Sequence, residues 1–91
     1  MNPDAELKAI CQQLSSKTKW DIIIYLYCAR YATVAVISRK LSLHHSTVSK
    51  ALRTLTDVKL LSRWKVRSTY LYELNEETWF RIGYLLHIRG Y

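Results

Sequence analysis

The chain has 91 residues, of which 49% are hydrophobic and 12% aromatic, so it is too apolar for a disordered chain and suits a single domain over residues 1–91. Fourteen lysines and arginines oppose seven acids, which gives a net charge of +7. The longest apolar run, Ile22 to Cys28, is far shorter than the roughly 18 residues of a membrane-spanning helix. We therefore expect no membrane partner and a cytoplasmic, intracellular location. A virus or plasmid gene acting inside a host cell would suit this small basic chain.

The positive charge is concentrated in the middle of the chain. Between Arg30 and Arg67 there are nine basic residues and one acid, Asp57, so this segment carries +8 and the remainder carries −1. Such a distribution suggests a polyanionic partner, which is either a nucleic acid or an acidic membrane face. The two cysteines, Cys11 and Cys28, are too few for a disulfide framework, and we expect both to be small buried hydrophobes; the alternative is a single disulfide between them in an unusual host.

Two helices are predicted in the first third of the chain. Residues 4–14 place apolar side chains on one face at helical spacing, namely Leu7, Ile10, Cys11 and Leu14. Residues 16–29 form the second helix, with a serine at its N-cap. Its middle, "DIIIYLYC", has the propensity of a strand, but its neighbours fit a helical domain.

The next two predicted helices are joined by a short turn. Thr33 caps the helix "TVAVISRKL", residues 42–44 make the turn, and the fourth helix covers about 45 to 58. Helices so closely joined make residues 33–58 a helix-turn-helix candidate.

After Lys59 the hydrophobic period changes from 3.6 to 2, which predicts a two-stranded hairpin over residues 60–75. Alternation places Trp64 and the tyrosines on a buried apolar face. It places three cations on the opposite face: Arg63, Lys65 and Arg67. A last helix, residues 76–90, follows the N-cap Asn75 and is apolar on more than one side.

This order of elements predicts a mainly α fold with a small β-hairpin. It is a winged helix-turn-helix, with a three-helix core, a wing, and extra N- and C-terminal helices. The segments "LSSKTKWDIIIYLY", "TVAVISRKLSLHHSTVSKALRTLTDVKLL" and "RSTYLYELN" resemble the arsenic-repressor (ArsR-type) transcription regulators over roughly residues 5 to 75. The most specific part is "STVSKALRTL", which is followed at the right distance by "TYLYELN".

The resemblance implies a set of DNA-reading residues at the start of the fourth helix: His45, Ser46, Ser49, Lys50 and Arg53. Helical geometry agrees, because these positions lie opposite the apolar face of Val48, Leu52 and Leu55. The hairpin would be the wing, and its cations, Arg63, Lys65 and Arg67, would contact phosphates or the adjacent minor groove.

Three features depart from the family pattern. Lys59 and Arg67 stand where relatives commonly have glycine, so the wing would turn differently. His44 replaces the usual serine cap, and Ser46 could cap the helix instead and shorten it. The metal-sensing cysteine pair of the third helix is absent, and the last helix holds a single histidine, His87.

We expect no metal, no cofactor, no small-molecule ligand and no enzymatic activity. The sequence has no glycine-rich phosphate loop, and its acids are scattered rather than paired.

The sequence therefore predicts a transcription regulator that binds double-stranded DNA sequence-specifically. We expect a homodimeric repressor that reads a pseudo-palindrome. Its dimer interface would be formed by the terminal helices, through Leu7, Ile10, Leu14, Trp79, Ile82, Leu85, Leu86 and Ile88. The alternative is a winged-helix protein–protein interaction module of a larger assembly, which would dock through the aromatic last helix.

Overall fold

The structure, a computed structural model, describes the backbone of residues 16–89 and the side chains of residues 16–87. The helix predicted over 4–14 lies outside the described residues, and so do three expected interface residues: Leu7, Ile10 and Leu14. The side chain of a fourth, Ile88, also lies outside the described part. In the described part the elements are α2 (Lys17–Ala29), β1 (Tyr31–Ala32), α3 (Val34–Leu41), α4 (His45–Asp57), β2 (Leu61–Val66), β3 (Thr69–Leu74) and α5 (Glu76–Arg89). No helix within residues 16–89 is long and apolar enough to cross a membrane.

Helix α2 forms although its middle has the composition of a strand. The hydroxyl oxygen of Ser16 accepts a hydrogen bond from the backbone N–H of Lys19 at 3.4 Å and so caps the helix. Three apolar side chains of α2 are completely buried: Ile22, Ile23 and Leu26. Tertiary burial of this face therefore outweighs the local preference for a strand.

Helices α3 and α4 are joined by a tight turn. The hydroxyl of Thr33 accepts from the backbone N–H of Val36 at 3.2 Å and starts α3. Helix α3 ends at Ser42, whose φ of 55° is left-handed. The N–H of Leu43 donates to the carbonyl of Ser38 at 3.0 Å, as in a Schellman motif.

The N-cap of α4 is His44. Its ring nitrogen Nδ1 accepts from the backbone N–H of Ser46 at 3.2 Å, which requires Nδ1 to carry no proton. The helix begins at His45, so the shorter helix capped by Ser46 does not form.

The sheet has three antiparallel strands in the order β1-β3-β2. The hairpin of β2 and β3 was predicted, but β1 was not. Strand β1 pairs Tyr31 with Glu73 and Ala32 with Tyr72. Two residues are too short to show any periodicity, so nothing in the sequence marks this strand.

Asn75 lies at the junction of three elements. Its side-chain oxygen accepts from the backbone N–H of Thr78 at 2.8 Å and caps α5. Its amide nitrogen donates to the carbonyl of Lys59, which follows α4. Its backbone N–H donates to the carbonyl of Leu60 at 3.2 Å, where β2 begins. One residue thus holds the end of α4, the base of the hairpin and the start of α5 together.

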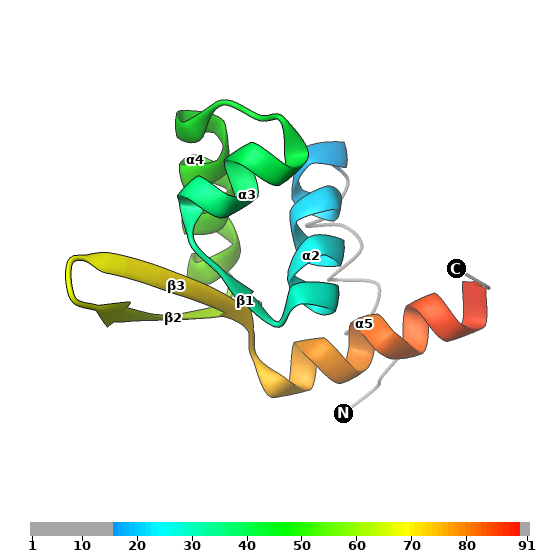
Figure 1. Cartoon of the computed structure of the whole chain (residues 1–91). Helices are drawn as coiled ribbons and strands as arrows, with labels where there is room; N and C mark the ends of the chain where they lie inside the picture. Colours follow the sequence, from blue (N-terminus) through cyan, green and yellow to red (C-terminus); the bar gives the residue numbers. More distant parts are fainter. Residues whose placement is uncertain (1–15, 90–91) are drawn as a thin grey trace.

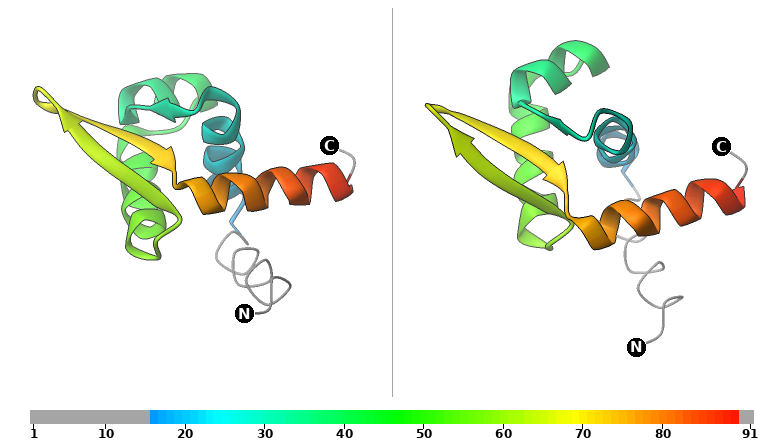
Figure 2. Two further views of the ribbon diagram at one scale, coloured as in Figure 1. Left: turned by 90° about the horizontal axis from the view of Figure 1, so that it is seen from below. Right: turned by 60° about the horizontal axis from the view of Figure 1, so that its bottom comes forward.

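Helices α2, α3 and α4 form a bundle on one side of the sheet (Figure 1). The hairpin leaves the bundle in one direction and α5 in the other (Figures 1 and 2). A single cluster of buried hydrophobic residues joins helices and sheet, and it consists of Ile22, Ile23, Leu26, Ala32, Ile37, Val48, Ala51, Leu52, Leu55, Leu60, Leu61, Tyr72, Leu74 and Ile82.

Candidate nucleic-acid interface

Helix α4 has one buried face and one exposed face. The buried face consists of Val48, Ala51, Leu52 and Leu55. All five residues that the sequence assigned to DNA reading are exposed: His45, Ser46, Ser49, Lys50 and Arg53. No acidic residue lies in the first turn of α4. The exposed face is therefore cationic and polar, and it is free of neighbouring carboxylates on its own helix near the N-terminus.

Basic residues take the left-handed positions that glycine usually occupies. Lys59 follows α4 with a φ of 68°, and Arg67 has a φ of 60° at the hairpin turn. The N–H of Lys59 donates to the carbonyl of Thr56 and that of Leu60 to the carbonyl of Leu55, both at 3.0 Å. These two bonds form a Schellman motif, which normally favours glycine at its left-handed residue.

The register of the hairpin corrects the expected division of its faces. Arg63 pairs with Tyr72, and Lys65 pairs with Tyr70. Because paired residues lie on the same face of an antiparallel sheet, the cations share a face with the tyrosines of β3. Leu61 lies on this face too and is buried, so the face looks toward the helical bundle. The cations therefore project from the side of the sheet on which α4 lies (Figure 1).

Tyr70 organises the cations on this face. The Cζ atom of Arg63 lies 4.5 Å from the centroid of the Tyr70 ring, and the Nζ atom of Lys65 lies 5.9 Å from it. Both distances allow cation–π attraction. The ring thus holds two cations close together despite their mutual repulsion.

Trp64 lies on the opposite face and is not part of the core. Its exposed fraction is 38%, and its ring meets that of Tyr31 edge to face at 6.2 Å. The prediction that Trp64 is buried together with the tyrosines is wrong, because Trp64 pairs with Leu71 rather than with a tyrosine.

An open hollow lined mostly by polar residues lies between helices α2 and α4, beside the exposed face of α4, and sequence analysis did not anticipate it. It is lined by Ser16, Thr18, Lys19, Thr47, Lys50, Ala51 and Thr54. The Lys19 side chain lies near α4 because of the way helices α2 and α4 pack together. No pattern in the sequence predicts that Lys19 and Lys50 line the same hollow.

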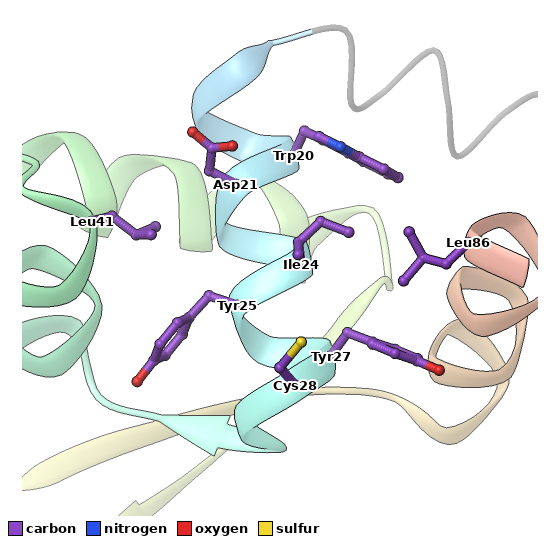
Figure 3. Close-up of a pocket in the computed structure, with 8 residues that line it drawn as sticks. All are labelled: Trp20, Asp21, Ile24, Tyr25, Tyr27, Cys28, Leu41 and Leu86. Carbon is purple, nitrogen blue, oxygen red and sulfur yellow. The ribbon is translucent and has the colours of Figure 1, made fainter. Parts of the chain in front are cut away.

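An apolar groove lies on another side of α2, between α3 and α5 (Figure 3). Its volume is about 750 Å³, and its lining consists of Trp20, Asp21, Ile24, Tyr25, Tyr27, Cys28, Leu41 and Leu86. Cys28 is an exposed free thiol, so the expectation that it is a buried hydrophobe is wrong. Cys11 lies outside the described residues.

The residues of α5 that were expected at a dimer interface differ in how far they are buried in their own chain. Ile82 is completely buried in its own chain, because α5 packs this residue into the core. It cannot also contact a partner. Trp79, Leu85 and Leu86 are half-buried against the same core. Among the α5 side chains that the structure describes, the exposed apolar ones are instead Phe80 and Tyr84, with exposed fractions of 61% and 55%.

Within the described residues, no three His, Cys, Asp or Glu side chains come close enough together to hold a metal ion. His87, on α5, is exposed.

No protein-family model matches the sequence, and no curated protein matches it. Solved structures do. HlyU from Vibrio cholerae N16961 superposes with a TM-score of 0.81 at 20% identity, over 100% of both chains. The transcriptional regulator HlyU from Vibrio vulnificus CMCP6 gives 0.79 at 23% identity, over 93% of this chain and 88% of that one. NolR from Sinorhizobium fredii gives 0.76 at 24% identity, over 96% and 88%.

The protein has a winged-helix fold. The predicted fold class is thereby confirmed, and the likeness to ArsR-type regulators holds at the level of the fold. Within the winged helix, α3 and α4 are the helix-turn-helix, α4 stands in the position of a recognition helix, and β2 and β3 form the wing.

Proposed function

We propose that this winged-helix protein is a sequence-specific transcription regulator of double-stranded DNA. The observation that carries the proposal is the exposure of all eight candidate DNA-binding residues on two cationic surfaces. One surface is the outer face of α4. The other is the wing, with Arg63 and Lys65 on its bundle-facing side and Arg67 at its turn.

The two surfaces suit different parts of a DNA duplex. Side chains near the N-terminus of α4 would enter the major groove, where Lys50 is able to donate to guanine O6 or N7 or to a phosphate beside the groove. The wing cations would contact phosphates and supply affinity that is largely independent of sequence. The likeness to a structure described as a transcriptional regulator supports this assignment.

The test is binding to duplex DNA over a salt series. Duplexes selected from a random library, and the DNA beside the protein's own gene, would be footprinted first. We expect protection of a short site, with an affinity that falls steeply between about 50 and 200 mM salt. Absence of retention on duplex DNA at low salt would refute the proposal.

We further propose a homodimer that acts as a repressor on a pseudo-palindromic site. The exposed aromatic side chains of α5 and the apolar groove of Figure 3 support this assembly, because each leaves apolar surface exposed that a second chain could cover. Two-fold symmetry would set the two recognition helices about 34 Å apart, in successive major grooves.

A protein–protein interaction module is the second candidate. It is favoured by the exposed aromatic residues outside the cationic surfaces, namely Tyr31, Phe80 and Tyr84. The same salt series separates the two functions, because a module that docks through aromatic side chains would show no salt-dependent retention on DNA.

A further inference from the structure

The polar hollow between the start of α2 and the exposed side of α4 has a volume of about 360 Å³. This is ample for a phosphodiester group. It is lined from both helices by hydroxyl-bearing residues and by two lysines, Lys19 and Lys50.

The hollow is positively charged and has no acidic residue in its lining. Neither helix has an acid in its first turn. In the described part of the chain, neither Lys19 nor Lys50 forms an ion pair. Two lysines that line one hollow without a carboxylate give it a positive potential, and an anion bound there would be attracted to both.

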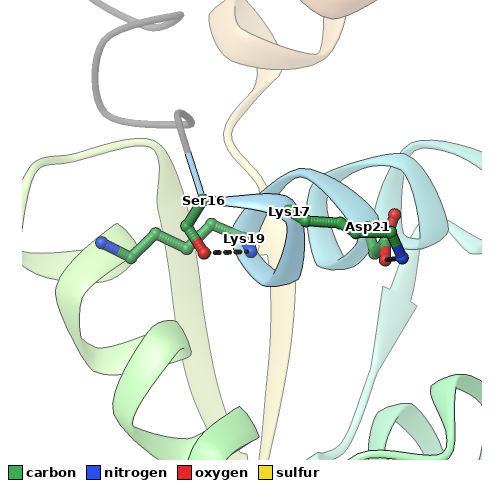
Figure 4. Close-up of polar contacts among 4 residues, drawn as sticks. All are labelled: Ser16, Lys17, Lys19 and Asp21. Carbon is green, nitrogen blue, oxygen red and sulfur yellow. Dashed lines mark hydrogen bonds and ion pairs between the residues drawn. The ribbon is translucent and has the colours of Figure 1, made fainter.

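A neighbouring lysine shows the contrast. Lys17 forms an ion pair with Asp21 at 3.1 Å, four residues further along α2. Figure 4 shows this pair on one side of the helix and the side chain of Lys19 extending in the other direction, toward α4. Within one turn of α2, Lys17 is therefore paired with a carboxylate, whereas Lys19 is available to a ligand.

Hydroxyl groups complete the lining. Thr54 donates its hydroxyl hydrogen to the carbonyl of Lys50 at 3.2 Å. The hydroxyls of Thr18 and Thr47 make no hydrogen bond to any described residue. Lysine ammonium and threonine hydroxyl groups are common donors to phosphate oxygens in protein–DNA interfaces.

The hollow is continuous with the proposed recognition face, because Lys50 belongs to both. We infer that the hollow seats one backbone phosphate of the bound duplex, beside the groove that α4 enters, and that Lys19 is its second cationic ligand. This inference rests on the proposed function. It adds α2 to the two elements, α4 and the wing, that contact DNA.

The test compares Lys19→Gln with Lys17→Gln on the same selected duplex. Both variants remove one positive charge from the same turn of α2 and keep most of the side-chain stem, so any effect of net charge alone is equal. We expect Lys19→Gln to reduce the magnitude of the salt slope by about 0.9 and to lower affinity roughly eightfold at about 0.1 M salt. We expect Lys17→Gln to keep the wild-type slope.

Ethylation interference on the duplex then locates the bound phosphate. With wild-type protein, ethylation of one phosphate flanking the major-groove site should block binding, and with Lys19→Gln that single signal should disappear. Thr18→Val, which leaves the charge intact, should weaken the same signal. Equal slopes for the two lysine variants, with an unchanged interference pattern, would overturn the inference alone. Failure of the wild-type protein to bind duplex DNA would overturn the proposed function with it.

Discussion

Within the described residues, four residues other than glycine have a positive φ angle, each where one element ends and the next begins. They are Arg30, Ser42, Lys59 and Arg67, with φ values of 79°, 55°, 68° and 60°. Such conformations cost a residue with a Cβ atom about 1–2 kcal/mol. The chain has only two glycines, and three of these four positions carry an arginine or lysine. Positive charge at the junctions is thus present at a cost in conformational stability.

Replacing Lys59 by glycine should stabilise the domain. Glycine tolerates the φ of 68° that ends the Schellman motif, while it loses some backbone entropy on folding. We expect a net gain of about 0.5–1 kcal/mol in the free energy of unfolding, measured by urea denaturation. The matched control is Lys40→Gly, in the last turn of α3, which should lose about 0.5–1 kcal/mol because that residue is helical. A loss of stability in both variants would contradict strain at Lys59.

Lys50→Ala and Arg53→Ala should each weaken binding to a selected duplex without unfolding the domain. Both side chains are exposed, so neither substitution disturbs the packing of the core. Removal of a hydrogen bond to a base edge should reduce discrimination between bases by about 1–3 kcal/mol, whereas removal of a phosphate contact should weaken binding to all duplexes alike; competition with duplexes altered at single positions measures both. Lys17→Ala serves as the charge-matched control. If both α4 variants bind with wild-type affinity and keep a native circular dichroism spectrum, α4 is not the recognition helix.

Among the elements that the structure describes, the helices were predictable and the faces of the wing were not. Ser16, Thr33 and Asn75 each have a side-chain oxygen that accepts from the third following N–H, and such residues mark helix starts in the sequence. Alternation within each strand was also visible. Which face of β2 joins which face of β3 depends on the register, and the register is set by the length of the turn.

The turn has two residues, so Val66 pairs with Thr69 and the cations meet the tyrosines. Shifting the register by one residue would have given the predicted faces. Arg67, the first residue of this turn, has a positive φ angle that is unfavourable for arginine. Nothing in the sequence therefore pointed to so short a loop. The α2–α4 hollow was equally hidden, because it arises from tertiary packing of two helices far apart in the sequence.

The wing should contribute affinity that depends on salt and hardly on sequence. Replacing Arg63, Lys65 and Arg67 together by alanine should reduce the magnitude of the salt slope by about 0.9 for each phosphate that the wing no longer neutralises. Tyr70→Leu keeps every charge but removes the ring that holds two of the cations, so affinity should fall while the slope changes little. A triple variant with the wild-type slope would show that the wing does not contact DNA.

At the scale of the whole molecule, helix α5 presents exposed aromatic side chains that a second chain could cover. Phe80 and Tyr84 lie four residues apart and therefore on one helix face, and both are exposed. We predict that Phe80→Glu and Tyr84→Glu convert a dimer into a monomer of 10.8 kDa in sedimentation equilibrium, without loss of helical structure.

Val66→Glu is the matched control for these variants. It places the same charge on an exposed apolar residue of the wing, and the dimer should persist. A wild-type protein that sediments as a monomer at micromolar concentration would refute the dimer.

The hydrogen bonds of Asn75 have a consequence for the geometry of such a dimer on DNA. Its amide ties the carbonyl of Lys59, and its oxygen ties the first turn of α5. The two elements that we propose contact DNA therefore share one anchor with the helix that would meet a second chain. The end of α4 and the base of the hairpin would therefore move together with the start of α5. A tilt of α5 would rotate α4 and the wing together. The angle at which two protomers meet would then set the length of DNA between their half-sites.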